Sequence, residues 1–499
     1  MAKQLQPEWQ HVKINLPGGY VSVGDFKAIL EAAHAADVKT IKIGARQQLL
    51  FSATPAQMED IEYQLFNQEL LYEVNENHYP NIVSSYVADG LYNQPHWLRE
   101  GIYKDILASF EYTPKLKINI VDANQSFVPY YTGNLNFVSS GVGNYWHVYI
   151  RWPKTNQVRS WSSLIYSMDI AAISKELESA IMDNKDLAAD DITTLCADLE
   201  LKIKASGAFH CQQVQEPLTE SDFRLPYYEG FNQYDDKYWL GIYRPDECYT
   251  VSFLLDVCNV CQTSRVGQIY TTPWRSLIIK DIRQQDRKGW DIILDKHRIN
   301  LRHASNELNW QIEDWCEPAL KLKRSIARYF DRWNIRTYRL CFGIKIGSNS
   351  GIWGSIIIKQ INDGIREPYF DVFHTQDFKA NSYNLVLYKQ RVTEKSLPAI
   401  LKTLCDCFYD ATLQNSHPVP EHHPSDLPEF SHSVPQQSLF RCPHCLSIYD
   451  PAYGDVLAAI EPGIAFDDLP TDYTCGLCGS PKKEFIAFDP SNTTPLKKH

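Results

Sequence analysis

The stretch RCPHCLSIYDPAYGDVLAAIEPGIAFDDLPTDYTCGLCGSPKKEFIAF occupies residues 441–488 and contains the spacing Cys-x2-Cys twice, with 29 residues between the two pairs. The pairs are Cys442 with Cys445 and Cys475 with Cys478. A tetrahedral metal site with four sulfur ligands needs four thiolates that converge on one point, and each Cys-x-x-Cys turn presents two of them. The sequence therefore predicts one metal held by these four cysteines. The spacing alone allows either iron or a structural zinc ribbon.

The residues between the two pairs resemble those of the rubredoxin family almost position for position. The matching residues are Tyr449-Asp450-Pro451, Gly454-Asp455, Ile460-Glu461-Pro462-Gly463, Phe466, Leu469-Pro470 and Lys482. The resemblance implies a β-rich fold and one mononuclear iron, which changes between ferric and ferrous forms with little ligand movement. Within this module we expect an aromatic core formed by Tyr449, Tyr453, Phe466, Tyr473 and Phe485.

Three residues of the module depart from the usual rubredoxin pattern. Leu446 stands at a usual glycine, Gly476 at a usual proline and Tyr473 at a usual tryptophan. A glycine lets a backbone N–H approach a cysteine sulfur, so Leu446 is expected to rearrange that hydrogen bond. Because hydrogen bonds to sulfur tune the reduction potential, we expect an altered potential with unaltered ligation.

Composition bounds the remaining possibilities. The chain has 499 residues, 44% of them hydrophobic, and a formal net charge of −11. This length predicts roughly three folded units. The acidic balance argues against a nucleic-acid partner, which needs excess Lys and Arg. No stretch approaches the about 18 uncharged apolar residues of a membrane helix, and the first residues carry no apolar signal core, so we expect a cytoplasmic protein.

The long upstream part contains an internal duplication. Residues 12–71 read as strand, helix, two strands and helix, with Ser22 and Asp25 as a helix cap. The same order recurs over residues 239–297. The part after each copy also matches, and we pair residues 81–85 with 299–303. Each repeat is therefore expected to have a small half and a larger α/β half.

This arrangement, together with Leu16-Pro17-Gly18-Gly19, Gly44-Ala45-Arg46-Gln47-Gln48 and Pro114-Lys115-Leu116-Lys117, is similar to the sirohaem-dependent nitrite and sulfite reductase family. In that family the two small ferredoxin-like halves pair, and the larger halves enclose sirohaem and a 4Fe-4S cluster. The resemblance implies that Arg46, Lys115 and Lys117 bind an anionic substrate, as cationic side chains can. The alternative is that these three residues form salt bridges or face solvent.

The cysteines that would hold the cluster are missing. The resemblance places them near 302–310 and 347–351, which read RHASNELNW and GSNSG. The corresponding stretches of the first repeat, VSSYVAD (83–89) and VDANQSF (121–127), also lack cysteine. We therefore expect neither the cluster nor sirohaem. Cys258, Cys261, Cys405 and Cys407 lie in apolar sequence that is predicted to be helical and are interpreted as buried thiols and not as metal ligands.

We predict an α+β protein with duplicated ferredoxin-like and sirohaem-reductase-like halves and a small C-terminal rubredoxin domain. Residues 413–438 are rich in Pro, His and Ser, which is typical of an extended linker. The predicted domains are a first ferredoxin-like half (1–75), a first reductase-like α/β domain (76–225), a second ferredoxin-like half (226–298), a second reductase-like α/β domain (299–412), the linker (413–438) and the rubredoxin domain (439–489).

Three functional hypotheses follow. The favoured one is a one-electron carrier that works with a redox protein partner, serving an assimilatory nitrite, nitrate or sulfite reductase. The second is an enzyme, a divergent sirohaem-type nitrite or sulfite reductase fed by its own rubredoxin domain. The third is a binding or regulatory protein with structural zinc. An excess of acidic residues in the module fits either docking to a basic partner or a solvated surface.

Overall fold

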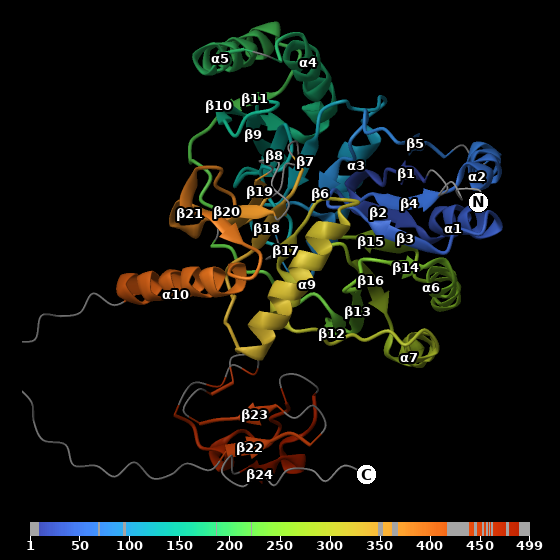
Figure 1. Ribbon diagram of the computed structural model, residues 1–499, viewed down its shortest axis with the longest axis vertical. Helices are drawn as coiled ribbons and strands as arrows, with labels where there is room; N and C mark the ends of the chain where they lie inside the picture. The colour runs from blue at the N-terminus through green and yellow to red at the C-terminus, as the bar shows by residue number, and fades with distance from the viewer. Residues whose placement is uncertain are drawn as a thin grey trace, which may run out of the picture. The chain divides into compact units, whose positions relative to one another are not determined.

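The computed structural model forms two compact units, Met1–His417 and Pro418–His499, which are described separately (Figure 1). We term the first unit the body and residues 439–489 the C-terminal module. The structure describes residues 9–67, 70–92, 96–185, 187–220, 222–347, 353–361, 368–416, 439–443, 447–451, 454–455, 458, 460, 463–475 and 479–488, with only the backbone of 189, 412–416 and 488. None of the helices in these ranges is long and apolar enough to cross a membrane.

The two small halves of the body exchange strands. The first five-stranded sheet has the order β14-β3-β4-β1-β5 and the second β12-β13-β16-β15-β2. The first contains β1 (Gln10–Ile14), β3 (Thr40–Ile43), β4 (Leu49–Ala53), β5 (Glu73–Val74) and β14 (Tyr249–Thr250). The second contains β2 (Tyr20–Ser22), β12 (Gly230–Tyr234), β13 (Lys237–Ile242), β15 (Gln268–Thr271) and β16 (Leu277–Ile282). Each sheet is thus completed by a strand from the other repeat.

The exchanged strands lead directly into matching helices. These halves contain α1 (Val23–Ala35), α2 (Pro55–Asn67), α6 (Val251–Ser264) and α7 (Arg287–Lys296). The Ser22 hydroxyl accepts a 3.0 Å bond from the Asp25 amide, which confirms the predicted cap. Thr250 caps α6 in the same way. Because α1 packs against α6 (Figure 1), the two halves share one hydrophobic core, in which Cys258 and Cys261 are buried.

The two larger halves repeat a second pattern. Their sheets have the orders β11-β10-β9-β8-β7-β6 and β17-β18-β19-β20-β21. The first comprises β6 (Val83–Ser84), β7 (Ile118–Val121), β8 (Leu135–Ser139), β9 (Tyr145–Arg151), β10 (Val158–Tyr166) and β11 (Cys211–Gln213). The second comprises β17 (Trp310–Gln311), β18 (Phe342–Lys345), β19 (Ile356–Ile361), β20 (Tyr369–Thr375) and β21 (Leu385–Thr393). In each sheet the first three strands along the chain are parallel and the later pairings are antiparallel.

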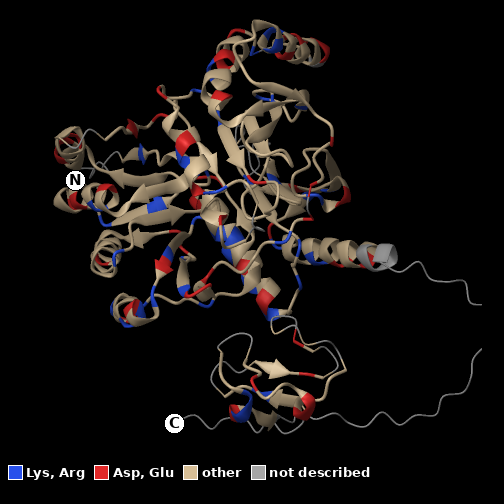
Figure 2. Cartoon of the chain, turned by 180° about the vertical axis from the view of Figure 1, so that it is seen from behind, with Lys and Arg blue, Asp and Glu red and all other residues tan. Residues whose placement is uncertain are grey.

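Helices flank these sheets at corresponding places. They are α3 (Glu100–Ala108), α4 (Ile170–Asp183), α5 (Ala189–Ser206), α8 (Ser305–Leu308), α9 (Glu317–Arg332) and α10 (Leu397–Ser416). α3 connects β6 to β7, and α9 connects β17 to β18 in the same way. α10 ends inside the predicted linker 413–438, and the rest of that linker lies outside the described residues. Lys and Arg are dispersed among Asp and Glu over the body in the view of Figure 2.

The topology corrects the expected alignment of the larger halves. The sequence comparison paired residues 81–85 with 299–303, but β17 holds the position of β6, because each is parallel to the next strand along the chain. The counterpart of VSSYVAD (83–89) is therefore WQIEDWC (310–316). This stretch does contain one cysteine, Cys316. The error arose because β17 is a two-residue strand with little pattern of its own.

The C-terminal module contains a small antiparallel sheet of β22 (Leu439–Arg441), β23 (Ile448–Tyr449) and β24 (Ile486–Phe488), in the order β23-β22-β24. Tyr449, Phe466 and Tyr473 are buried in its core, and Phe485 packs against them. This confirms the predicted aromatic core for these four residues, while Tyr453 lies outside the described residues.

Candidate functional site

Two tight turns of the C-terminal module place their first cysteines in the same way. The Cys442 amide donates a 2.8 Å hydrogen bond to the Ser447 carbonyl oxygen, and the Cys475 amide donates a 2.8 Å bond to the Ser480 carbonyl oxygen. In both turns the acceptor lies five residues after the cysteine. Cys442 and Cys475 are 0% and 4% exposed, so both thiols are withdrawn from bulk water.

One side chain connects the two turns. The Ser447 hydroxyl lies 3.1 Å from Cys475 Sγ, while the Ser447 carbonyl holds the Cys442 amide. Cys445, Cys478, Leu446 and Gly476 lie outside the described residues. Within the described part of the chain, His, Cys, Asp and Glu side chains form no group of three or more that could hold a metal.

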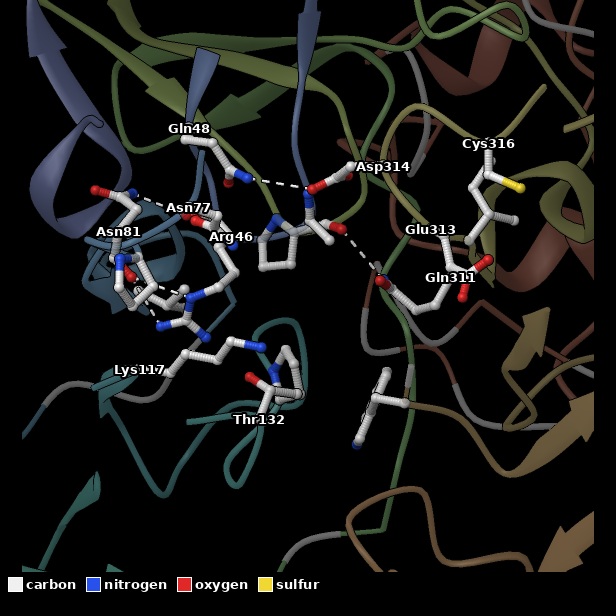
Figure 3. A pocket seen from close by; sticks show the side chains of 17 residues that line it. Arg46, Gln48, Asn77, Asn81, Lys117, Thr132, Gln311, Glu313, Asp314 and Cys316 are labelled. Carbon is white, nitrogen blue, oxygen red and sulfur yellow. Dashed lines mark hydrogen bonds between the residues drawn. The ribbon is translucent and has the colours of Figure 1, made fainter. Parts of the chain in front are cut away.

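The body contains a cavity of about 370 Å³ that is lined by residues of both repeats (Figure 3). Arg46 reaches it from the turn between β3 and β4, and Lys117 from the residues just before β7. Asp314 and Cys316, which lie between β17 and α9, line the opposite side in Figure 3. The cavity therefore forms where the β3–β4 turn of the first repeat meets the segment between β17 and α9 of the second repeat.

Neutral oxygens hold Arg46. Its guanidinium donates hydrogen bonds to the carbonyl oxygens of Asn81 (2.8 and 3.1 Å) and Ile118 (2.9 Å), and to Asn119 Oδ1 (3.2 Å). Burial and the nearby Arg151 lower its pKa to about 9. The bonds fix the group in place without cancelling its charge.

Lys117 adds a second cation beside Arg46. Burial, followed by the charges of Arg46 and Arg151, lowers its pKa to about 8. Among the described residues its Nζ has no hydrogen-bond partner, and Figure 3 shows the side chain directed into the cavity. Lys115, in contrast, is exposed and does not line the cavity. The structure thus brings together two of the three predicted anion-binding residues.

The sequence analysis missed a third cation near the cavity. Arg151, at the end of β9, is 8% exposed and donates hydrogen bonds to the carbonyl oxygens of Gly133 (3.2 Å) and Thr132 (3.0 Å). Its guanidinium also lies 5.0 Å from the centre of the Tyr383 ring. The sequence signal that could have identified Arg151 is its charge at the end of the mostly apolar run YWHVYIR (145–151).

The carboxylates near the cavity are already paired with protein donors. Asp314 accepts hydrogen bonds from the Ala45 amide (3.1 Å), Arg275 (3.0 Å) and Gln48 (3.2 Å). Glu313 accepts from the amides of residues 346 and 347 at 2.9–3.0 Å. Since Asp314 is paired with Arg275 and Glu313 is held by backbone amides, Arg46 and Lys117 on the other side of the cavity remain available to a small anion.

The duplication also shows why only one repeat contributes the cations. In the turns 44–48 and 272–276, the amide of the first residue donates to the carbonyl of the fifth, at 2.8 and 3.0 Å. The two turns are therefore equivalent, and Trp274 holds the position of Arg46. The indole of Trp274 instead donates to the Phe127 carbonyl oxygen at 2.7 Å. The second turn serves packing between the repeats.

Comparison with known proteins decides the family of the C-terminal module. The sequence profile of the rubredoxin family matches residues 439–485. Rubredoxin-1 of Chlorobaculum tepidum is 44% identical over 52 residues, which are 10% of this chain and 75% of that protein. The chain belongs to the rubredoxin family through its C-terminal module. The rubredoxin module supports binding of a mononuclear iron and electron transfer.

One further relative is similar to the C-terminal module, and one solved structure is similar to the body. The high molecular weight rubredoxin of Moorella thermoacetica is 46% identical over 46 residues, 9% of this chain and 20% of that protein. The body is similar to the solved structure of the Mycobacterium tuberculosis NirA protein, with a TM-score of 0.64 and 13% identity over 81% of this chain and 84% of that chain. This similarity shows the fold, and it confirms the expected sirohaem-reductase-like architecture upstream of the rubredoxin module.

Proposed function

We propose that this protein is a one-electron carrier in which Cys442, Cys445, Cys475 and Cys478 bind one iron. The observation that carries the proposal is the pair of equivalent turns around the buried Cys442 and Cys475. Four soft thiolates in a tetrahedral arrangement suit iron, which supplies a ferric/ferrous couple when it is bound. The backbone bonds hold Cys442 and Cys475 in place, so these two ligands need little movement when the charge changes.

The surface of the rubredoxin module favours a protein partner. Asp467, Asp468 and Asp472 are exposed, whereas Asp455 accepts a 2.8 Å bond from the Tyr473 hydroxyl and serves the fold. We propose that the three exposed carboxylates meet a basic redox partner, belonging to a nitrite, nitrate or sulfite reductase system in the cytoplasm. Charge complementarity of this kind speeds encounter between redox proteins.

We further propose that the body binds a small oxyanion through Arg46 and Lys117 without holding a 4Fe-4S cluster or sirohaem. The cluster needs four cysteines; of the two stretches that correspond in the sequence to its expected ligands, 310–316 contains one cysteine, Cys316, and 347–351 contains none. The residues present therefore do not fit the coupled centre.

A second candidate is a divergent sirohaem-type nitrite or sulfite reductase that receives electrons from its own rubredoxin module. The NirA-like fold and the cationic cavity with Cys316 in its lining favour it. The two candidates differ in whether the body carries a tetrapyrrole.

One set of measurements on the full chain tests both. The chain is produced in a host that makes sirohaem, its metals are quantified, and its visible spectrum is recorded before and after dithionite. One iron per chain and a ferric thiolate spectrum that bleaches on reduction support the carrier. Bands of a bound tetrapyrrole would establish the reductase instead, and a colourless chain with one zinc would contradict both.

A further inference from the structure

Ser447 is placed to act on the metal centre from outside the ligand set. It follows the first Cys-x2-Cys turn and precedes β23, whose pairing of Ile448 with Arg441 fixes the backbone at this point. Its carbonyl oxygen accepts the Cys442 amide at 2.8 Å, and its hydroxyl lies 3.1 Å from Cys475 Sγ. One residue thus contacts a cysteine of each pair.

The direction of the hydroxyl bond follows from the state of the sulfur. A cysteine that binds iron does so as a thiolate, which has no proton and only accepts hydrogen bonds. The Ser447 hydroxyl must then be the donor to Cys475 Sγ. Ser447 is half-buried and Cys475 is 4% exposed, so water screens this interaction only in part.

We infer that Ser447 raises the reduction potential of the iron site by donating an O–H···S hydrogen bond to Cys475. This inference rests on the proposed iron site. A tetrathiolate iron centre carries one more negative charge when ferrous than when ferric, so its sulfurs accept a hydrogen bond more strongly in the reduced form. The donor therefore stabilises the reduced form relative to the oxidised form, and its loss lowers the potential.

Ser447 directly follows Leu446, one of the positions at which the module departs from the usual rubredoxin pattern. The sequence predicts that a leucine there rearranges a backbone N–H···S bond of the first turn. Ser447 is the next residue, and it supplies a side-chain donor to the sulfur of the opposite turn. This hydrogen bond reaches the ligand set from the residue next to the position at which the pattern departs.

The test is a redox titration of the full chain, followed by its visible spectrum, with matched variants. Ser447→Val and Ser447→Thr share the same shape and differ in the hydroxyl, so their comparison separates hydrogen bonding from packing. Thr471→Val removes an exposed hydroxyl elsewhere in the module and serves as the control. We expect Ser447→Val to shift the equilibrium about tenfold toward the ferric form, which for a one-electron couple is about 59 mV. Ser447→Thr and Thr471→Val should retain the potential of the unaltered chain.

The possible results distinguish this inference from the proposed function. An unchanged potential in an iron-loaded Ser447→Val chain, or equal shifts in the Val and Thr variants, would overturn the role of Ser447 and leave the iron site intact. If Ser447→Val does not bind iron, Ser447→Ala is titrated in its place with the same expected shift. Absence of iron from the unaltered chain would overturn the proposed function itself.

Discussion

The hydroxyl of Thr271 donates a 2.8 Å hydrogen bond to the carbonyl oxygen of Gln47, although the two residues belong to different repeats. The Gln47 side chain returns a 3.0 Å bond to the Thr271 carbonyl, and its amide oxygen accepts the Ser84 amide at 3.0 Å. Gln47 is fully buried and has a φ of +65°. These bonds join three parts of the body at the turn that also presents Arg46.

Removal of the Thr271 hydroxyl should weaken the body. Thr271→Val leaves a buried carbonyl of Gln47 without this donor, and we expect the free energy of unfolding to fall by about 1–3 kcal/mol. Chemical denaturation followed by tryptophan fluorescence measures the change. Thr219→Val, at an exposed site, should stay within about 0.5 kcal/mol of the unaltered chain. Equal stability of both variants would show that the bond between the repeats contributes nothing.

Gly19 should not tolerate a side chain. Its φ is +73°, and a Cβ would lie 2.2 Å from Gln47 Nε2. This side-chain nitrogen is held by its hydrogen bond to the Thr271 carbonyl oxygen. Gly90 has the same φ but has no atom within 4 Å of an added Cβ. We expect Gly19→Ala to cost about 1–3 kcal/mol more than Gly90→Ala in the free energy of unfolding. Equal losses would mean that the side chain of Gln47 moves aside without cost.

Binding of a small oxyanion should depend on Lys117 and not on Lys115. Lys117→Met removes a cation from the cavity, and loss of a charged hydrogen bond predicts about ten- to hundredfold weaker nitrite binding. Lys115→Met removes the same charge from an exposed site and should leave the dissociation constant unchanged. Isothermal titration calorimetry gives both constants, and equal effects of the two variants would exclude the cavity as the binding site.

The same binding should weaken as the pH rises. The pKa of Lys117 is lowered from 10.5 to about 8, and an anion favours its charged form. Affinity for nitrite, which is fully ionised throughout, is therefore present below pH 8 and is lost as the pH passes through about 8. Calorimetry between pH 6.5 and 9.5 checks this, and Lys117→Met should remove the decline.

Substitution of one ligand should change the chromophore without unfolding the body. Cys475→Ser replaces a sulfur with an oxygen, so we expect loss of the native ferric charge-transfer spectrum. Cys407 lies on α10 and is exposed, although the apolar sequence around it predicted a buried thiol. Cys407→Ser should therefore leave that spectrum as it is. Far-UV circular dichroism reports on the body in both variants. A native spectrum in Cys475→Ser would show that the ligand set is wrong.

Local signals predicted the local structure well. The two strands predicted between the helices of residues 12–71 are present as β3 and β4, and Ser22 caps α1 as expected. Both follow from a few neighbouring residues, through alternating burial in the strand and the amide that needs a partner at the helix start. The aromatic core of the rubredoxin module was predicted from a resemblance carried by closely spaced residues.

Relationships between distant residues could not be predicted in this way. The pairing of Tyr249 with Ile41 joins strands of two and four residues from different repeats, and no pattern within either strand specifies its partner. Arg151 reaches the neighbourhood of Arg46 only because β9 lies two strands away from β7 in the finished sheet. The misplaced counterpart of β6 has the same origin, since the position of β17 is defined by its pairing with β18.

The exchange of β2 and β14 bears on how the protein is made. During synthesis, one edge of β3 stays unpaired until β14 (residues 249–250) has been made. In the same way, β2 has no strand to pair with until β15 has been made. The N-terminal half must therefore wait for the other half before either sheet is complete, and the two halves fold as one cooperative piece. A fragment that stops before residue 249 would expose that edge and pair with other copies of itself.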